Sequence, residues 1–353
     1  MSDALARAEI EKVDPDGMLG DVLAQVLQLG DALWRVQSAE VRKRDLPGGL
    51  AVCGMGGSAI GGDLAAAILG DRATRPLRTI RDYALEPWVG PDSLALCCSY
   101  SGDTEESLAC FEAAGIVEAP RVAVTTGGRL AEAARAEGVP VIGVPGGMRP
   151  RAAVLYFTVA VLECAALCGA APQLHTELDS ATSLLEKLAE AWGPDSDDDS
   201  EAKSLARNLH GTLPVVYGSG PTAAPARRWK TQLNENADMA AFWSELPEAD
   251  HNEICGWQRA AAAAPLSAVF LADSDQHPRI RRRIELTAEE VERSGAPALQ
   301  LESRGESRLE RILSLVLLGD VVSVYLAALA GINPAEAEPI DRLKGALGST
   351  GQP

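Results

Sequence analysis

Basic residues and histidine are scarce in this sequence. Its 353 residues include 32 Lys and Arg against 50 Asp and Glu, a formal net charge of −18, and only four His. A chain this acidic repels polyanions, which argues against a nucleic-acid partner or an anionic surface as a partner. Any phosphate group that binds must therefore be held by a local site that works against an unfavourable overall field.

Long uninterrupted apolar runs are also missing. The stretch MSDALARAEIEKVD is charged from its third residue and lacks the apolar core of a signal peptide. The longest apolar stretch, ILSLVLLGDVVSVYLAALAGI, is interrupted near its centre by Asp320. A buried helix fits this pattern better than a membrane span does. We therefore expect no membrane association and a cytoplasmic location.

The cysteines do not form a recognisable framework. There are seven, an odd number, and most of them lie inside apolar runs. No Cys and His spacing resembles a zinc site, and the usage is typical of a reduced, cytoplasmic protein. We expect neither a metal nor any other cofactor.

Short apolar runs alternate with helical ones from residue 50 onward, a pattern that predicts βαβ units and parallel sheets covered on both faces. Strands are predicted at 50–54, 77–81, 93–99, 121–125 and 140–144. Helices are predicted at 59–69, 104–114 and 129–136, with long helices at 151–167 and 174–191. The fold class is therefore α/β.

The pattern restarts after an acidic run. The second half contains VYGSGPTA where the first has VCGMGGSA, and further strands are predicted at 264–271 and 296–301. This order of elements indicates two copies of one α/β sandwich. The predicted organisation is a helical segment at 1–40, a first sandwich at 41–192, an acidic linker at 193–203 and a second sandwich at 204–353.

The glycine turn after the first strand has two readings. Its G-x-G-x-x-A pattern fits the dinucleotide fingerprint, with a strand before it and a helix after it. However, the acidic residue that should end the second strand is missing, since Asp82 comes late and follows Arg81. The fingerprint alone is a weak signal for a dinucleotide.

A second loop favours a simple phosphate. The stretch CCSYSGDTEESL presents Ser99, Ser101 and Thr104 between a strand and a helix, and Gly57 and Ser58 lie in the first loop. Hydroxyls and free N–H groups at a helix N-terminus form an anion site at the carboxyl ends of parallel strands. Helix capping would explain one of these hydroxyls well and three poorly. We therefore predict a site for a phosphomonoester.

The motifs GMGGSAIGGD and SYSGDTEES resemble those of the sugar isomerase (SIS) fold, in which two such sandwiches bind phosphorylated sugars. Within that superfamily, residues 50–344 look most like the bifunctional phosphoglucose/phosphomannose isomerases. The resemblance implies a homodimer that isomerises a phosphorylated hexose between aldose and ketose through a cis-enediolate. One departure is Asp103, which stands where the family commonly has Asn.

The resemblance also assigns catalytic roles. In the family pattern, Glu235 is the base that moves the proton and Arg151 stabilises the enediolate, with Arg149 as the second choice. His251 would assist ring opening from the partner subunit, and Lys344 would lie at the ring oxygen. From composition alone, the glutamate and the lysine would be read as solvated surface residues, and the histidine equally well as an exposed loop residue.

Three other functions remain open from the sequence. The same fold also serves non-catalytic sugar-phosphate sensors, although these need only the hydroxyl loop. A second is an isomerase with a single activity, such as one that acts on aminosugar or pentose phosphates. An NAD-dependent enzyme is the third, and it rests on the glycine fingerprint alone.

Overall fold

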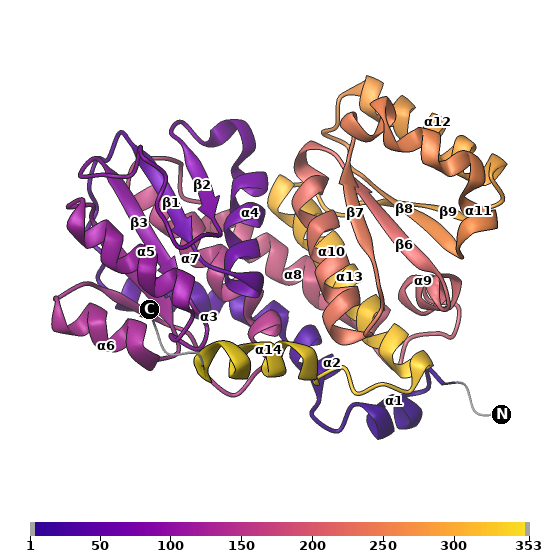
Figure 1. Ribbon diagram of the computed structural model, residues 1–353, viewed down its shortest axis with the longest axis horizontal. Helices are drawn as coiled ribbons and strands as arrows, with labels where there is room; N and C mark the ends of the chain where they lie inside the picture. The colour runs from indigo at the N-terminus through magenta and orange to yellow at the C-terminus, as the bar shows by residue number, and fades with distance from the viewer. Residues whose placement is uncertain (1–3, 350–353) are drawn as a thin grey trace.

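The computed structural model describes residues 4–349, which form two α/β halves side by side (Figure 1). The outermost residues of the predicted segments, 1–3 and 350–353, lie outside this range. Three helices precede the first sheet, namely α1 (Arg7–Val13), α2 (Met18–Leu23) and α3 (Gln25–Ser38).

The first half is built on a parallel five-stranded sheet in the order β2-β1-β3-β4-β5. All five predicted strands are confirmed, with ends that differ by at most one residue. The strands are β1 (Gly49–Cys53), β2 (Leu77–Ile80), β3 (Ser93–Cys98), β4 (Arg121–Thr125) and β5 (Val141–Gly143). The helices between and after them are α4 (Gly56–Leu69), η1 (Gly70–Arg72), α5 (Glu105–Ile116), α6 (Gly128–Ala136), η2 (Pro150–Ala153), α7 (Val154–Leu167) and α8 (His175–Trp192).

Both faces of this sheet are covered, so successive strand residues enter different cores. In β1, Leu50 and Val52 belong to the core that includes α4 and α7, whereas Ala51 and Cys53 belong to the core that includes α5 and α6. A strand buried on both faces is continuously apolar, as these runs are. The first half is a three-layer αβα sandwich.

The second half repeats this plan with a parallel four-stranded sheet in the order β7-β6-β8-β9. Its strands are β6 (Leu213–Gly218), β7 (Phe242–Glu245), β8 (Leu266–Ala272) and β9 (Ala298–Glu302). Its helices are α9 (Glu201–Leu209), η3 (Gly220–Thr222), α10 (Ala223–Asn236), η4 (Glu248–His251), η5 (Glu253–Arg259), α11 (Ala260–Ala263), α12 (Pro278–Arg293), α13 (Arg308–Ala330) and α14 (Glu338–Ser349). The order matches β2-β1-β3-β4, which agrees with the predicted internal repeat.

One hydrophobic core joins the two halves. It runs from Val52 and Phe157 in the first half to Trp229 and Leu317 in the second, and it also takes in helices α2 and α3.

The last residues of the predicted linker 193–203 are helical instead of forming part of an exposed linker. Residues 201–203 form the first turn of α9, and Lys203 is buried with its ammonium donating to two backbone carbonyls.

Two helical segments are long and apolar enough to cross a membrane, Pro150–Leu167 and Arg308–Ala330. Protein covers 83% of the first and 94% of the second, so both lie in the interior. Asp320, which interrupts the second, is completely buried, as expected for a core helix.

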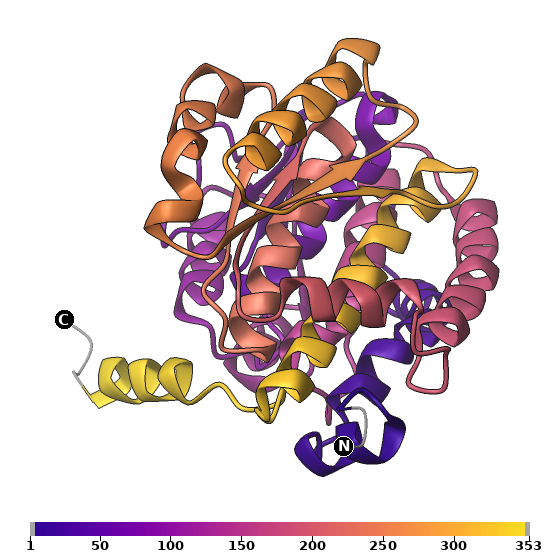
Figure 2. The same cartoon turned by 90° about the vertical axis from the view of Figure 1, so that its right-hand side faces the viewer.

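The terminal helix α14 does not pack into the core. It projects away from the body (Figure 2), and residues 341–347 are all exposed.

The contact between α10 and α13 yields a stability prediction. A Cβ atom on Gly319 would lie 2.2 Å from Nε1 of Trp229, which donates to the carbonyl of Leu315. We expect Gly319→Ala to lower the free energy of unfolding by about 1–3 kcal/mol, because the indole cannot retreat from a packed core. Urea denaturation measures the change.

Gly30 provides the matched control, since it lies on an exposed turn of α3 with no atom within 4 Å of a built Cβ. Gly30→Ala should raise the free energy of unfolding by about 0.5–1 kcal/mol through helix propensity. Equal effects of the two substitutions would contradict the tight α10–α13 contact.

Candidate active site

Two loops meet at the carboxyl ends of β1 and β3. The first leads into α4, whose first turn carries Gly57 and Ser58, and the second leads into α5 and carries Ser99, Ser101 and Thr104. The hydroxyl of Ser58 accepts a hydrogen bond from the backbone N–H of Tyr100 at 3.2 Å. The predicted hydroxyl residues are therefore brought together by the fold.

The hydroxyls of the second loop have different surroundings. Ser99 is buried, and its Oγ lies 2.8 Å from Oγ1 of Thr104 and accepts from the N–H of Gly102 at 3.0 Å. Ser101 is exposed and Thr104 half-buried. Thr104 occupies the N-cap position of α5 without a side-chain capping bond. Ser99 therefore shapes the loop, while Ser101 and Thr104 present hydroxyls beside a helix N-terminus, where an anion is favoured.

The additional negative charge at Asp103 is engaged elsewhere. One oxygen of its carboxylate accepts from the backbone N–H of Arg129 at 3.2 Å and faces the Nε of the same residue at 3.3 Å. This pair is exposed, so solvent screens it. Where the family commonly has Asn, this chain therefore has the carboxylate of Asp103, which pairs with Arg129 on α6.

The first loop also lies against the segment that carries Arg151. A Cβ atom on Gly57 would be 3.1 Å from the carbonyl oxygen of Pro150 and 3.2 Å from Cα of Arg151. A glycine at this position lets α4 begin directly beside η2. The first hydroxyl-bearing loop and Arg151 therefore lie side by side.

Arg151 is buried, with 5% of its surface exposed. Its Nε donates to Oδ1 of Asn236 at 2.5 Å, one Nη donates to the carbonyl of Pro334 at 2.5 Å, and the other lies 3.7 Å from the carboxylate of Glu235. Burial lowers the pKa of the guanidinium, and the charge of Glu235 opposes this shift. A guanidinium remains protonated in proteins, so the site holds a fixed cation beside a partly exposed carboxylate.

A second buried arginine anchors the backbone at this point. Arg228 on α10 donates to the carbonyl of Arg151 at 2.9 Å and forms two hydrogen bonds with Asp320 on α13, at 2.5 and 2.9 Å. Burial raises the pKa of Asp320, and the charge and hydrogen bonds of Arg228 oppose the shift. Asn236 extends the network, because its Nδ2 donates to Oγ of Ser323 at 2.8 Å.

The sequence analysis missed Asn236 and Arg228 as supports for Arg151. A signal was available for their partner, since Asp320 is a charged residue in the middle of the longest apolar stretch. Such a residue normally requires a buried partner of opposite charge. No comparable signal distinguished Asn236 from the polar residues around it.

The other two predicted catalytic residues lie on the surface. His251 ends η4 and Lys344 lies on α14, and both side chains are exposed. Within residues 4–349, the structure gives neither of them a hydrogen bond or ion pair with Arg151 or Glu235. Arg149, the alternative to Arg151, is exposed and lies 3.8 Å from Asp16.

Among the described residues 4–349, no group of three or more His, Cys, Asp or Glu side chains is arranged to hold a metal ion.

Known proteins resemble this chain in sequence and in fold. Residues 198–347 match the family described as the bacterial phospho-glucose isomerase C-terminal SIS domain. A bifunctional phosphoglucose/phosphomannose isomerase from Caldicellulosiruptor bescii is 35% identical over 88% of this chain and 92% of its own length. A protein of the same name from Aquifex aeolicus is 36% identical over 84% and 89%. In fold, a hypothetical protein from Thermus thermophilus superposes with a TM-score of 0.75 at 16% identity, over 98% of this chain and 93% of that one.

The contact between Arg151 and Asn236 can be tested as a coupling energy. We expect Asn236→Leu and Arg151→Leu each to lower the free energy of unfolding, and the double substitution to fall short of their sum by more than about 1 kcal/mol, because each single variant strands a buried polar partner. Urea denaturation of the four proteins gives the cycle. A coupling near zero would show that Asn236 does not hold the guanidinium.

Proposed function

Because the chain belongs to the bifunctional phosphoglucose/phosphomannose isomerase family, we propose that it interconverts glucose 6-phosphate and mannose 6-phosphate with fructose 6-phosphate. The observation that carries the proposal is the pairing of a buried guanidinium, Arg151, with a partly exposed carboxylate, Glu235, at 3.7 Å. This pair lies beside loops rich in hydroxyl and N–H groups, so a base, a fixed cation and a phosphate anchor converge.

The phosphate of the substrate binds the two loops in this proposal. Ser58, Ser101 and Thr104 supply hydroxyls, Ser99 holds the second loop in shape, and Gly57 allows the first loop to approach Arg151 closely. The free N–H groups at the starts of α4 and α5 add partial positive charge. These local donors offset the unfavourable field of a chain with a net charge of −18.

Glu235 then moves the proton. In the open-chain aldose, its carboxylate takes the proton from C2 and later returns it to C1, while the hydroxyl proton passes from O2 to O1. Negative charge develops on the enediolate oxygens in between, where the guanidinium of Arg151 stabilises it. Because Asn236 and Pro334 fix that guanidinium, little reorganisation is needed when the charge appears.

The shared intermediate explains two activities at one site. Glucose and mannose 6-phosphate differ only in configuration at C2, and C2 becomes planar in the cis-enediolate. A base that reaches either face of this carbon, or a site that permits rotation about the C1–C2 bond, accepts both epimers.

Ring opening is assigned to His251 and Lys344, with His251 donated by the partner in a homodimer. A neutral-range pKa suits a histidine to this task. Two observations support a second chain at the site: both residues are exposed here, and α14 carries the exposed apolar side chains of Ile340 and Leu343 away from the body (Figure 2).

The proposed reaction uses only protein side chains, so the proposal includes no metal or other cofactor. A cytoplasmic location is supported by six buried cysteines that are free thiols, namely Cys53, Cys97, Cys98, Cys110, Cys164 and Cys168. Unpaired thiols are typical of reducing compartments.

The role of Glu235 can be tested with Glu235→Gln. We expect kcat for both aldose phosphates to fall by about 10³-fold, because the amide cannot accept the proton, while KM changes little. A coupled assay of fructose 6-phosphate formation from glucose 6-phosphate and from mannose 6-phosphate measures this.

Glu186→Gln is the matched control, since Glu186 is an exposed helical glutamate on α8. It should retain wild-type kcat on both substrates. Turnover of only one epimer by the wild type would narrow the substrate, and phosphosugar binding without any turnover would identify a sensor instead.

The donation of His251 across a dimer can be tested by subunit hybrids. Homodimers of Glu235→Gln and of His251→Ala should both be nearly inactive. A hybrid with one chain of each, purified through two different tags, should recover about half of the wild-type activity, because one of its two sites then has both wild-type residues. An inactive hybrid would place His251 in the site of its own chain.

A further inference from the structure

One cavity of the molecule lies away from the proposed catalytic residues. It has a volume of about 420 Å³ and opens at the amino ends of the strands of the first sheet. Its walls are the segment 40–46 before β1, the starts of β3 and β4, the residues before β5, and the end of α7. The strands separate it from the phosphate loops by roughly 20 Å, the length of a six-residue strand such as β3.

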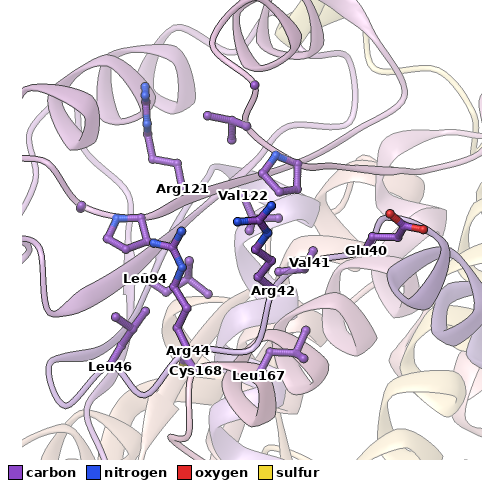
Figure 3. Close-up of a pocket in the computed structure, with 15 residues that line it drawn as sticks. Glu40, Val41, Arg42, Arg44, Leu46, Leu94, Arg121, Val122, Leu167 and Cys168 are labelled. Atoms are coloured by element: carbon purple, nitrogen blue, oxygen red, sulfur yellow. The ribbon is translucent and has the colours of Figure 1, made fainter.

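Three arginines line this cavity (Figure 3). Arg121 is already neutralised, since it pairs with Glu137 at 2.5 Å and lies over the ring of Phe111. Arg42 and Arg44 differ, because within the described range neither guanidinium has a carboxylate within 4.0 Å. In Figure 3 both side chains reach in the same direction from the segment before β1, while Arg121 points away from them.

Unpaired arginines are unexpected in this protein. Carboxylates outnumber basic groups by 50 to 32, and most of its arginines, from Arg7 to Arg342, lie within an ion pair. Glu40 contributes one carboxylate to the wall, so Arg42 and Arg44 together still outweigh it. The cavity therefore carries a local excess of positive charge on an acidic surface, which attracts small anions.

The backbone that carries these arginines is fixed. The N–H of Arg44 donates to the carbonyl of Leu167 at 2.9 Å, and the N–H of Leu46 donates to the carbonyl of Cys168 at 3.1 Å. Arg75 donates to the same carbonyl of Cys168 and to Asp45. The carboxyl end of α7 is therefore capped by protein donors, so these carbonyls are already satisfied where an anion would enter.

Apart from Glu40, the rest of the lining consists mostly of apolar residues. The side chains of Leu46, Leu94, Val122 and Leu167 and the rings of Pro120 and Pro140 contribute to the walls. The volume lies within the range of small-molecule sites and exceeds what a single phosphate ion needs. Guanidinium groups bind carboxylates and phosphates in bidentate fashion, which suits them to an anion carried on a compact organic body.

We propose that this cavity is a second ligand site, one that binds a small organic anion bearing phosphate or carboxylate groups through Arg42 and Arg44. The anionic groups face the two guanidiniums and the body of the ligand covers the apolar wall. The site is separate from the phosphate loops, at the opposite end of the same sheet.

Isothermal titration calorimetry of the full-length protein tests this proposal. Citrate and adenosine 5′-monophosphate are the probes, and the paired substitution of Arg42 and Arg44 distinguishes this cavity from the phosphate loops. We expect Arg42→Ala/Arg44→Ala to weaken binding of the recognised probe by at least about tenfold, because two charge-assisted contacts are lost. Binding of citrate would identify carboxylates, and binding of the nucleotide would identify a phosphate, as the recognised group.

Arg259→Ala/Arg279→Ala is the control, because it removes the same charge from two exposed arginines of the second half. It should change the dissociation constants by less than about twofold. Equal affinity of the wild type and the Arg42/Arg44 variant would overturn the site, as would no binding at about 1 mM of either probe. Inorganic phosphate binding as tightly as both probes would overturn the role of the apolar wall.

These outcomes do not depend on catalysis. The readout is heat of binding, so the second site can be found in a protein that proves inactive on hexose phosphates. Conversely, an active isomerase that binds neither probe would leave the proposed function intact and remove only this site.

Discussion

The burial of the Arg151 guanidinium constrains the whole molecule. A buried guanidinium is tolerated only where its N–H groups find acceptors and its charge finds a partner. Here Asn236 on α10, the carbonyl of Pro334 after α13 and the carboxylate of Glu235 meet those needs. All three belong to the second half, while Arg151 belongs to the first. The two halves must therefore be correctly docked for the cation to be stable.

The second arginine extends this dependence. Arg228 is held by Asp320, and Asp320 also accepts from Gln25 of the N-terminal helices at 2.6 Å. Three parts of the chain are thus connected through side chains that exclude water. In such water-excluding surroundings, electrostatic interactions are stronger than at the surface. A fixed positive charge therefore stabilises an anionic intermediate more strongly here than it would at the surface.

Sequence patterns predicted the parts of the fold that depend on local composition. Buried parallel strands are continuous apolar runs, so β1 and β4 were located within a residue. The edge strand β7 was not predicted, since its four residues are partly exposed and include Ser244 and Glu245. Lys203 also misled the prediction, because lysine normally marks a surface and here its ammonium is satisfied by carbonyls of the preceding segment.

The candidate site divides in the same way. The hydroxyl loops and Glu235 lie at the ends of predicted elements, and short motifs locate them. Asn236 and Arg228 act through contacts between α10, α13 and η2, and such contacts leave no trace in local periodicity, whereas Asp320 is visible as a break in an apolar run. His251 and Lys344 are exposed in the single chain, and within residues 4–349 neither forms a hydrogen bond or ion pair with Arg151 or Glu235. Their proposed roles therefore depend on a second chain.

The core that runs beneath both sheets has an evolutionary consequence. The matching strand orders β2-β1-β3-β4 and β7-β6-β8-β9 show that the two halves repeat one plan. The halves are not independent, because α13 packs against α8 and α2 as well as α10, and nearly all of its length is covered. Recombination between related genes within the acidic segment would therefore bring together halves whose facing helices had not been selected to fit each other. Because the two halves share one core, a change in the facing helices of one half must be matched in the other.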